Sequence, residues 1–279
     1  MTTTTSTFRV PTLSVGTPET VKVTAWHVVR SEWLKLRTLR SSWVVLAIAI
    51  GALILIGFAV CWSTIADWSS VPSFARDHVD GLRISMAGFE LSELALGVLG
   101  IVFIGGEYST GQIRSSLSAV PTRLPVLWTK AGLLGAVTFA AMLPAALFTF
   151  FVSQRILAKQ HIQTTWSSPN VARSVMGVVL YLTVIAMIGV GLGALLRNIA
   201  GGIAGFVGIM TVLPAITSAL PQHWGDKINK FLPSSAGRAL MSFQSNNHML
   251  KPWTGFALFL GYALALLVVA SVMLKRRDA

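Results

Sequence analysis

The sequence predicts an all-α integral membrane protein with six transmembrane helices, and three observations lead to this fold class. The chain has 279 residues, of which 53% are apolar and 11% charged, with a mean hydropathy of +0.69. Soluble domains carry about 25% charged residues, and a soluble fold of this length would not bury so much apolar surface. Six apolar stretches follow one another, and tryptophans lie at their ends or between them. The stretches cover residues 43–62, about 94–106, 131–151, 175–196, 199–220 and 253–274.

Five of the six stretches are 20 to 22 residues long and contain no Asp, Glu, Lys, Arg or His. A helix needs ~20 apolar residues to cross ~30 Å of hydrocarbon, so each is long enough to span. The second stretch has only 13 residues unless it extends back to Met86, and the longer form includes Glu90 and Glu93. We expect a helix here too, because a chain inside lipid must satisfy its own backbone groups and no barrel-like alternation is present.

The basic residues predict which side of the membrane each end faces. With six spans both termini share one side, which carries 13 of the 22 Lys and Arg residues and 4 of the 10 acidic residues. An excess of basic residues marks the cytoplasmic side, so both termini are expected in the cytoplasm of a bacterial cell. The net charge of +12 then reflects topology, and no nucleic-acid partner is expected. We expect a disordered tail over residues 1–23, a connecting helix over 24–41 and the six-span domain over 42–279.

The segment ahead of the first span is basic and amphipathic. At 100° per residue, apolar side chains gather on one side and basic side chains on the other. The apolar side holds Ala25, Trp26, Val29, Trp33 and Leu36, and the basic side holds Arg30 and Arg37. Glu32 breaks this pattern. We expect a helix lying among the inner headgroups, with membrane lipid as its partner.

The connection between the second and third spans, residues 107–130, has the marks of a short helix. Gly105 and Gly106 permit a sharp bend at the membrane face. Thr110 can cap a helix, and Pro121 can end it. The helix would present Ile113, Leu117 and Val120 on one side. Such a helix is placed to receive force from another protein, and an ordinary surface turn is the alternative.

Five motifs occur in order along residues 24–277. They are the run Ser31-Glu32-Trp33-Leu34-Lys35-Leu36-Arg37, Glu107-Tyr108-x-x-Gly111-x-Ile113-Arg114, Pro121-x-Arg123 followed by Lys130, the turn Leu196-Arg197-Asn198, and Leu232-Pro233. Together they resemble the ABC-transporter permeases of the type-2, exporter-type family. The resemblance implies a coupling helix over residues 110–120 that contacts a separate ATP-binding subunit. The contacting residues would be Thr110, Gly111, Ile113, Arg114, Leu117 and Pro121.

The chain has no motif for binding ATP itself. G-x-x-x-x-G-K-[ST] does not occur in it, so a partner subunit would bind ATP and Mg²⁺ and hydrolyse the ATP. We therefore expect no enzyme activity and no cofactor in this chain. Its five histidines are scattered, and neither H-E-x-x-H nor G-x-S-x-G is present. The resemblance also implies that two permease copies, or a copy and a paralogue, enclose the substrate path. The sequence does not identify the substrate.

Glu107 stands where the second span leaves the membrane. We expect its carboxylate to pair with Arg114, or with Arg30, Arg37 or Arg40 of the connecting helix. A pair with the connecting helix would transmit movement of the coupling helix to the first span. At the surface it would add only ~0–1 kcal/mol to stability.

Glu90 and Glu93 lie three residues apart and so share one helical face. They either line a pathway through the membrane or lie in the outer headgroup layer beside Asp77, Asp80 and Arg83. The first reading supports an alternative function, an ATP-independent secondary transporter or channel that uses both carboxylates.

Small residues at helix-contact spacing predict close packing. Gly189 with Gly193, and Gly201 with Gly205, each form G-x-x-x-G. We expect these glycines to serve packing within the chain rather than between copies.

Overall fold

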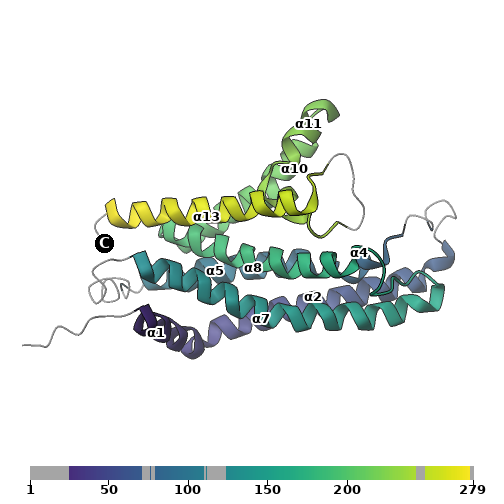
Figure 1. Ribbon diagram of the computed structural model, residues 1–279, viewed down its shortest axis with the longest axis horizontal. Coiled ribbons are helices and arrows are strands. Elements are labelled where there is room, and N and C mark those ends of the chain that lie inside the picture. Colours follow the sequence, from purple (N-terminus) through teal and green to yellow (C-terminus); the bar gives the residue numbers. More distant parts are fainter. Residues whose placement is uncertain are drawn as a thin grey trace, which may run out of the picture.

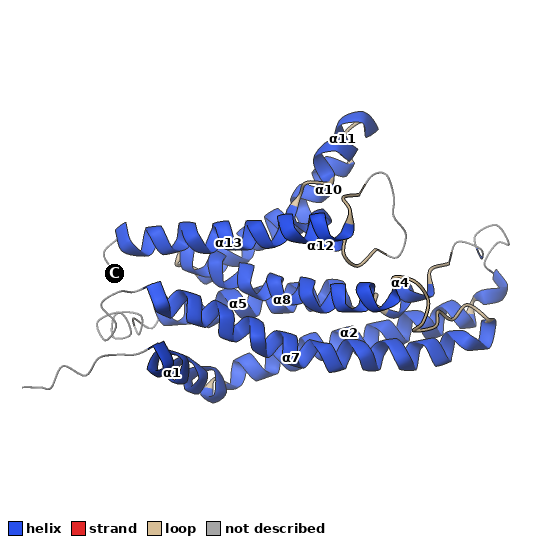
Figure 2. Ribbon diagram, viewed as in Figure 1, coloured by secondary structure: helices blue, strands red, loops and turns tan. Residues whose placement is uncertain are grey.

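The computed structural model contains six helices that are long and apolar enough to cross a membrane (Figure 1). It describes residues 25–70, 76, 79–109, 111, 124–242 and 249–276, and these residues include no strand (Figure 2). The six are α2 (Arg40–Ala66), α5 (Phe89–Ser109), α7 (Leu124–Leu157), α8 (Val171–Leu196), the run from α9 to α10 (Ile199–Ser218) and α13 (Pro252–Arg276). The predicted all-α, six-helix membrane fold is confirmed.

Each of these helices overlaps one predicted stretch, but several are longer. The longer form of the second stretch is correct, because α5 begins at Phe89 and contains both Glu90 and Glu93. Helix α7 has 34 residues and continues through Pro144. It is longer than its uncharged stretch because polar residues in its end turns find partners inside the protein. Lys130 and Gln154 are both buried there.

Helix α8 is the centre of the bundle. In its apolar stretch 78% of the residues are buried, more than in any of the other five helices. Glycines bring α8 and α5 together, because a Cβ atom on Gly100 would overlap the carbonyl oxygen of Ala186, and one on Gly189 would overlap that of Gly97. The expected packing of Gly189 within the chain is therefore seen. The second glycine pair, at residues 201 and 205, makes no such close approach.

The long helices run side by side, so that their ends form two groups (Figure 1). We call one group the α1 end, after the connecting helix α1 (Ala25–Thr38), and the C-terminal end of α13 lies on this side. The α4 end takes its name from α4 (Gly81–Ser85), where Asp80 caps the helix by accepting hydrogen bonds from two backbone N–H groups. Short elements complete the chain: η1 (Trp68–Ser70), η2 (Ala158–Gln160) and α12 (Pro233–Arg238).

The fifth span is the least regular. It follows a tight turn in which Arg197 has a φ of 52°, and the Asn198 side chain caps α9 (Ile199–Val207) by accepting from the Gly201 N–H at 3.0 Å. A π-helical segment, Gly208–Val212, lies just before Pro214, whose ring cannot fit a regular turn. Beyond it α10 (Leu213–Ser218) and α11 (Gln222–Asn229) project away from the bundle (Figure 1). Only 17% of this span is buried.

Candidate coupling site at the α1 end

Four charged side chains from three helices meet at the α1 end. They are Glu32 and Lys35 of α1, Glu107 in the last turn of α5 and Lys130 near the start of α7. Lys130 Nζ lies 2.6 Å from Glu32 Oε2 and 3.1 Å from Glu107 Oε1. Lys35 Nζ lies 2.8 Å from Glu32 Oε1 and 2.9 Å from Glu107 Oε1. Each lysine thus bridges both carboxylates, and we call these four residues the charge cluster.

Three of the four side chains of the charge cluster are buried, Lys35 is partly exposed, and the cluster is formally neutral. Lys130 has no exposed surface, Glu32 is 1% exposed and Glu107 is 6% exposed. Lys130 Nζ also lies 4.1 Å from the centre of the Phe103 ring, a distance at which the ring face attracts the cation. Taking charges out of water is costly, and close paired geometry is needed to offset that cost. The cluster therefore fixes the relative positions of three helices.

Helix α1 packs against the protein through one edge of its predicted apolar side, together with Glu32. The buried side chains are Val28, Glu32 and Leu36, spaced four residues apart, whereas Trp26 and Trp33 are exposed. The expected position of this helix among the inner headgroups is not tested by these contacts and stays a prediction. The acidic residue that broke the amphipathic pattern is the one that enters the protein, because Lys130 of α7 compensates its charge.

Of the expected partners of Glu107, Arg114 lies outside the described residues, and none of the three arginines of the connecting helix pairs with it. Glu107 pairs with the connecting helix, but through Lys35 and not through Arg37 or Arg40. Among the described residues, no ion pair involves Arg30, Arg37 or Arg40, and all three are exposed. Glu107 pairs with Lys35 and not with an arginine because Lys35 lies on the side of α1 that faces α5 and α7, one turn from Glu32. In place of the expected weak surface pair, the structure has a part-buried one, in which the side chain of Glu107 is 8% exposed and that of Lys35 is 27% exposed.

Burial alone would lower the pKa of Lys35. The hydrogen bonds and charges of Glu32 and Glu107 outweigh it, so the pKa of Lys35 lies above its usual value. An upward shift means that this stabilisation is complete below the usual lysine pKa and is lost only as the pH rises through the folded-state value. Lys35 is therefore charged at neutral pH.

Residues of the charge cluster lie at both ends of the connection between the second and third spans. Glu107 precedes this connection and Lys130 follows it, and both contact α1. The predicted contact residues Thr110, Ile113, Arg114, Leu117 and Pro121 lie outside the described residues. Gly111 is described and has a φ of 71°, a left-handed conformation that glycine adopts without strain. Both ends of this connection are therefore held against α1.

The turn between the fourth and fifth spans also reaches this end. The Arg197 guanidinium carbon lies 5.5 Å from the centre of the Tyr108 ring, and Tyr108 follows Glu107 directly. The predicted turn at residues 196–198 is therefore next to the end of α5.

A second polar group lies toward the α4 end. Arg238 of α12 donates from Nη2 to Glu93 Oε2 at 3.2 Å, and its Nη1 lies 3.8 Å from Glu90 Oε1. The Glu93 side chain is 4% exposed, whereas that of Glu90 is 69% exposed. Neither expected reading fits both carboxylates: Glu90 is accessible, and Glu93 is buried and paired. Sequence reasoning missed Arg238 because it lies 145 residues from Glu93.

The described residues contain no group of three His, Cys, Asp or Glu side chains that could hold a metal ion. Comparison of the chain with known protein families, curated proteins and solved structures found no match. The charge cluster and the sequence motifs are therefore the features of this chain that bear on its function.

Proposed function

We propose that this chain is the permease subunit of an ATP-driven ABC exporter in a bacterial cytoplasmic membrane. In this proposal two copies, or a copy and a paralogue, enclose the substrate path, and separate ATP-binding subunits bind ATP and Mg²⁺ and hydrolyse the ATP. The observation that carries it is the charge cluster, which ties both ends of the predicted coupling segment to the connecting helix.

Through the contacts of the charge cluster, a force on residues 110–120 would reach the first span. A partner that pushes on residues 110–120 would move the last turn of α5 and the start of α7. Because Glu107 and Lys130 both contact α1, the connecting helix would follow. α1 is separated from α2 only by Leu39, so the first span would be pulled in turn. Breaking one partner from a buried charge group costs about 3–5 kcal/mol, so the cluster would move as a unit rather than come apart.

The rival proposal is an ATP-independent secondary transporter or channel that uses Glu90 and Glu93. An ion-coupling carboxylate needs a charge that the transported ion compensates. Glu93 already pairs with Arg238, and Glu90 is exposed. This arrangement favours a role for Glu93 in holding α12 against α5, and we therefore prefer the exporter.

Co-purification tests the proposal. If an ATP-binding-cassette subunit is encoded beside its gene, the chain would be expressed with that subunit, and the mass of the detergent-solubilised complex would be measured. We expect a complex with two permease and two ATP-binding subunits and with ATPase activity. A chain that binds no such subunit, and whose transport in liposomes depends on an ion gradient alone, would support the rival proposal instead.

A further inference from the structure

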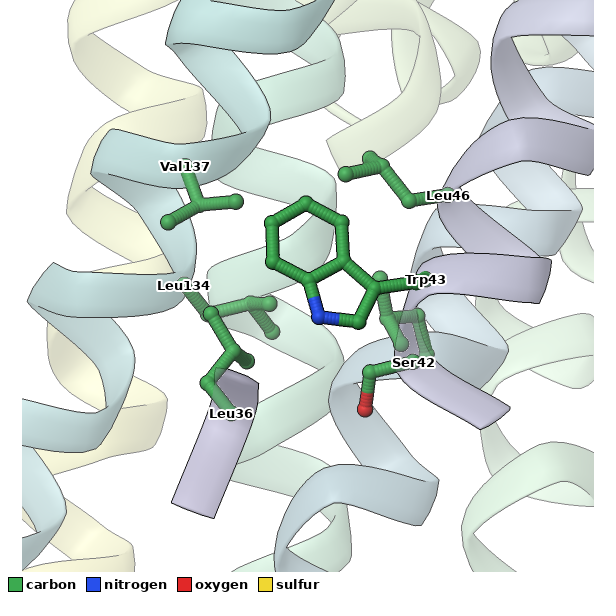
Figure 3. Close-up of a pocket in the computed structure, with 7 residues that line it drawn as sticks. Leu36, Ser42, Trp43, Leu46, Leu134 and Val137 are labelled. Atoms are coloured by element: carbon green, nitrogen blue, oxygen red, sulfur yellow. The ribbon is translucent and has the colours of Figure 1, made fainter. Parts of the chain in front are cut away.

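The helices are closely packed at the α1 end. The hollow beside Trp43, lined mostly by leucine and valine, has a volume of about 10 Å³, room for one water molecule at most (Figure 3). The charge cluster joins α1 to α5 and α7 at the same end. Helix α5 is therefore held firmly by its Glu107 end, and a change of partners along α5 is easier near its other end, where Arg238 of α12 pairs with it.

Near its Phe89 end, α5 offers Arg238 two carboxylates. The Arg238 Nη2 donates to Glu93 Oε2 at 3.2 Å, and its Nη1 lies 3.8 Å from Glu90 Oε1. The two carboxylates share one face of α5 and are three residues apart, about 4.5 Å along the helix axis. The Arg238 guanidinium carbon lies 5.2 Å from the centre of the Phe89 ring, which attracts the cation to this face. One arginine thus lies between two alternative partners.

The two carboxylates differ in their surroundings. The Glu93 side chain is 4% exposed, whereas that of Glu90 is 69% exposed. A pair with Glu93 holds the guanidinium against the protein, and a pair with Glu90 alone would draw it toward the surface. A buried carboxylate that loses its cation is destabilised much more than an exposed one. The pair with Glu93 is therefore the more stable of the two, in agreement with its shorter distance.

The packed position of α12 combines favourable and unfavourable contacts. Ser234 Oγ and Arg238 Nε are buried and have no hydrogen-bond partner among the described residues. Unpaired buried polar groups are destabilising, and these two would reach water if α12 moved outward. In opposition, Gly237 lies so close to the Tyr181 ring that a Cβ atom on it would be 2.6 Å away. The packed position is therefore favoured by less than its close packing alone would give.

The chain just before α12 provides a pivot. The carbonyl oxygen of Phe231 accepts a hydrogen bond from Tyr262 Oη of α13 at 2.9 Å. Phe231 lies two residues before α12, which has six residues and begins at Pro233. Further back, α10 and α11 project away from the bundle (Figure 1). A rotation about Phe231 would move Arg238 the most, because Arg238 is at the opposite end of α12.

We propose that α12 is a latch with two positions. In the seated position Arg238 pairs with the buried Glu93, as in this structure. In the released position Arg238 pairs with Glu90 alone, and α12 swings outward about Phe231. Release uncovers the surfaces of α8 and α13 that Gly237 contacts, so the latch controls access to the bundle near the α4 end. The latch is a property of this chain alone and does not depend on an ATP-binding subunit.

Labelling of a cysteine in α12 tests this proposal. Ser234→Cys reports release, because Ser234 is 2% exposed in the seated position. All variants would carry Cys61→Ala, and the purified chain in detergent would be treated with a small maleimide. The labelling rate is proportional to the population of the released position when opening is fast.

The two carboxylates should affect this rate in opposite directions. We expect Glu93→Gln to raise it at least tenfold, because the seated position loses its buried pair. Glu90→Gln should lower it by about two- to fivefold, because the released position loses an exposed pair, which contributes less. Glu90→Gln leaves the buried pair intact, so this arm holds even if Glu93→Gln does not fold. A rate that Glu90→Gln leaves unchanged or raises would overturn the proposal.

Two controls separate release of the latch from loosening of the whole bundle. Ser271→Cys, buried in α13, should be labelled slowly in every variant. Glu93→Gln that speeds the labelling of both cysteines equally would contradict a local movement. Arg238→Gln should raise the labelling rate of Ser234→Cys and make it insensitive to Glu90→Gln. A Glu90→Gln effect that persists without Arg238 would show that the two carboxylates do not compete for this arginine.

Discussion

Replacing Lys130 with methionine should destabilise the protein more than any other single loss of charge at the α1 end. Lys130 has no exposed surface and bridges two carboxylates at 2.6 and 3.1 Å. Its removal leaves Glu32 and Glu107 with Lys35 alone, at a cost of about 3–5 kcal/mol. At roughly 2–4 °C per kcal/mol this lowers the melting temperature by roughly 6–20 °C. Thermal denaturation in detergent, followed by fluorescence or by the loss of monodisperse protein, measures the change.

Matched variants distinguish the stability lost by disrupting the charge cluster from the stability lost by removing any lysine. Lys35→Met removes a partly exposed partner and should cost less, about 1–3 kcal/mol. Lys251→Met removes an exposed lysine elsewhere and should have little effect. Glu32→Gln combined with Lys130→Met should cost less than the sum of the two single changes, because each already removes the shared pair. A Lys130→Met variant as stable as Lys251→Met would refute the reasoning.

Three further predictions concern other parts of the chain. Ile113→Asp should weaken recovery of the ATP-binding subunit in pull-downs, and unchanged recovery with unchanged transport would remove this residue from the interface. Gly100→Leu should abolish folded protein in detergent because the new side chain meets the α8 backbone, whereas Gly132→Leu, with open space around it, should not. Arg238→Gln should lower the melting temperature because it leaves Glu93 buried and unpaired. Adding Glu93→Gln should restore much of the loss. A double variant that is less stable than Arg238→Gln alone would contradict this expectation.

The spans could be predicted from the sequence because hydropathy is a local property of the chain and the thickness of the bilayer sets the length of each apolar stretch. Glu107 could also be singled out, since two glycines and the end of an apolar stretch mark its position. The partners of Glu107 could not be predicted, because the pairing depends on how α1 is rotated against α7. In the sequence, Glu32 was visible only as an acidic residue that interrupts the amphipathic pattern of this helix. That break was the available signal: an acidic residue on the apolar side of an amphipathic helix needs a buried cation.

Arg238 carried no comparable signal. It lies in a short helix whose position against α5 depends on close packing, because a Cβ on Gly237 would lie 2.6 Å from the Tyr181 ring and one on Gly255 would lie 2.6 Å from the Ala236 carbonyl oxygen. Such approaches follow from the assembled bundle and not from any short stretch of sequence.

Coupling between ATP hydrolysis and movement of the first span tests the central claim most directly. A cysteine at Ser63, exposed near the far end of α2, would report this movement through its labelling rate with and without ATP, while Cys61 is buried. We predict that ATP changes the labelling rate in the wild-type complex. Glu107→Gln should keep ATP hydrolysis and lose that change, and Glu90→Gln, on the same helix but exposed, should keep both. A Glu107→Gln complex in which ATP still changes the labelling rate as in wild type would contradict the account.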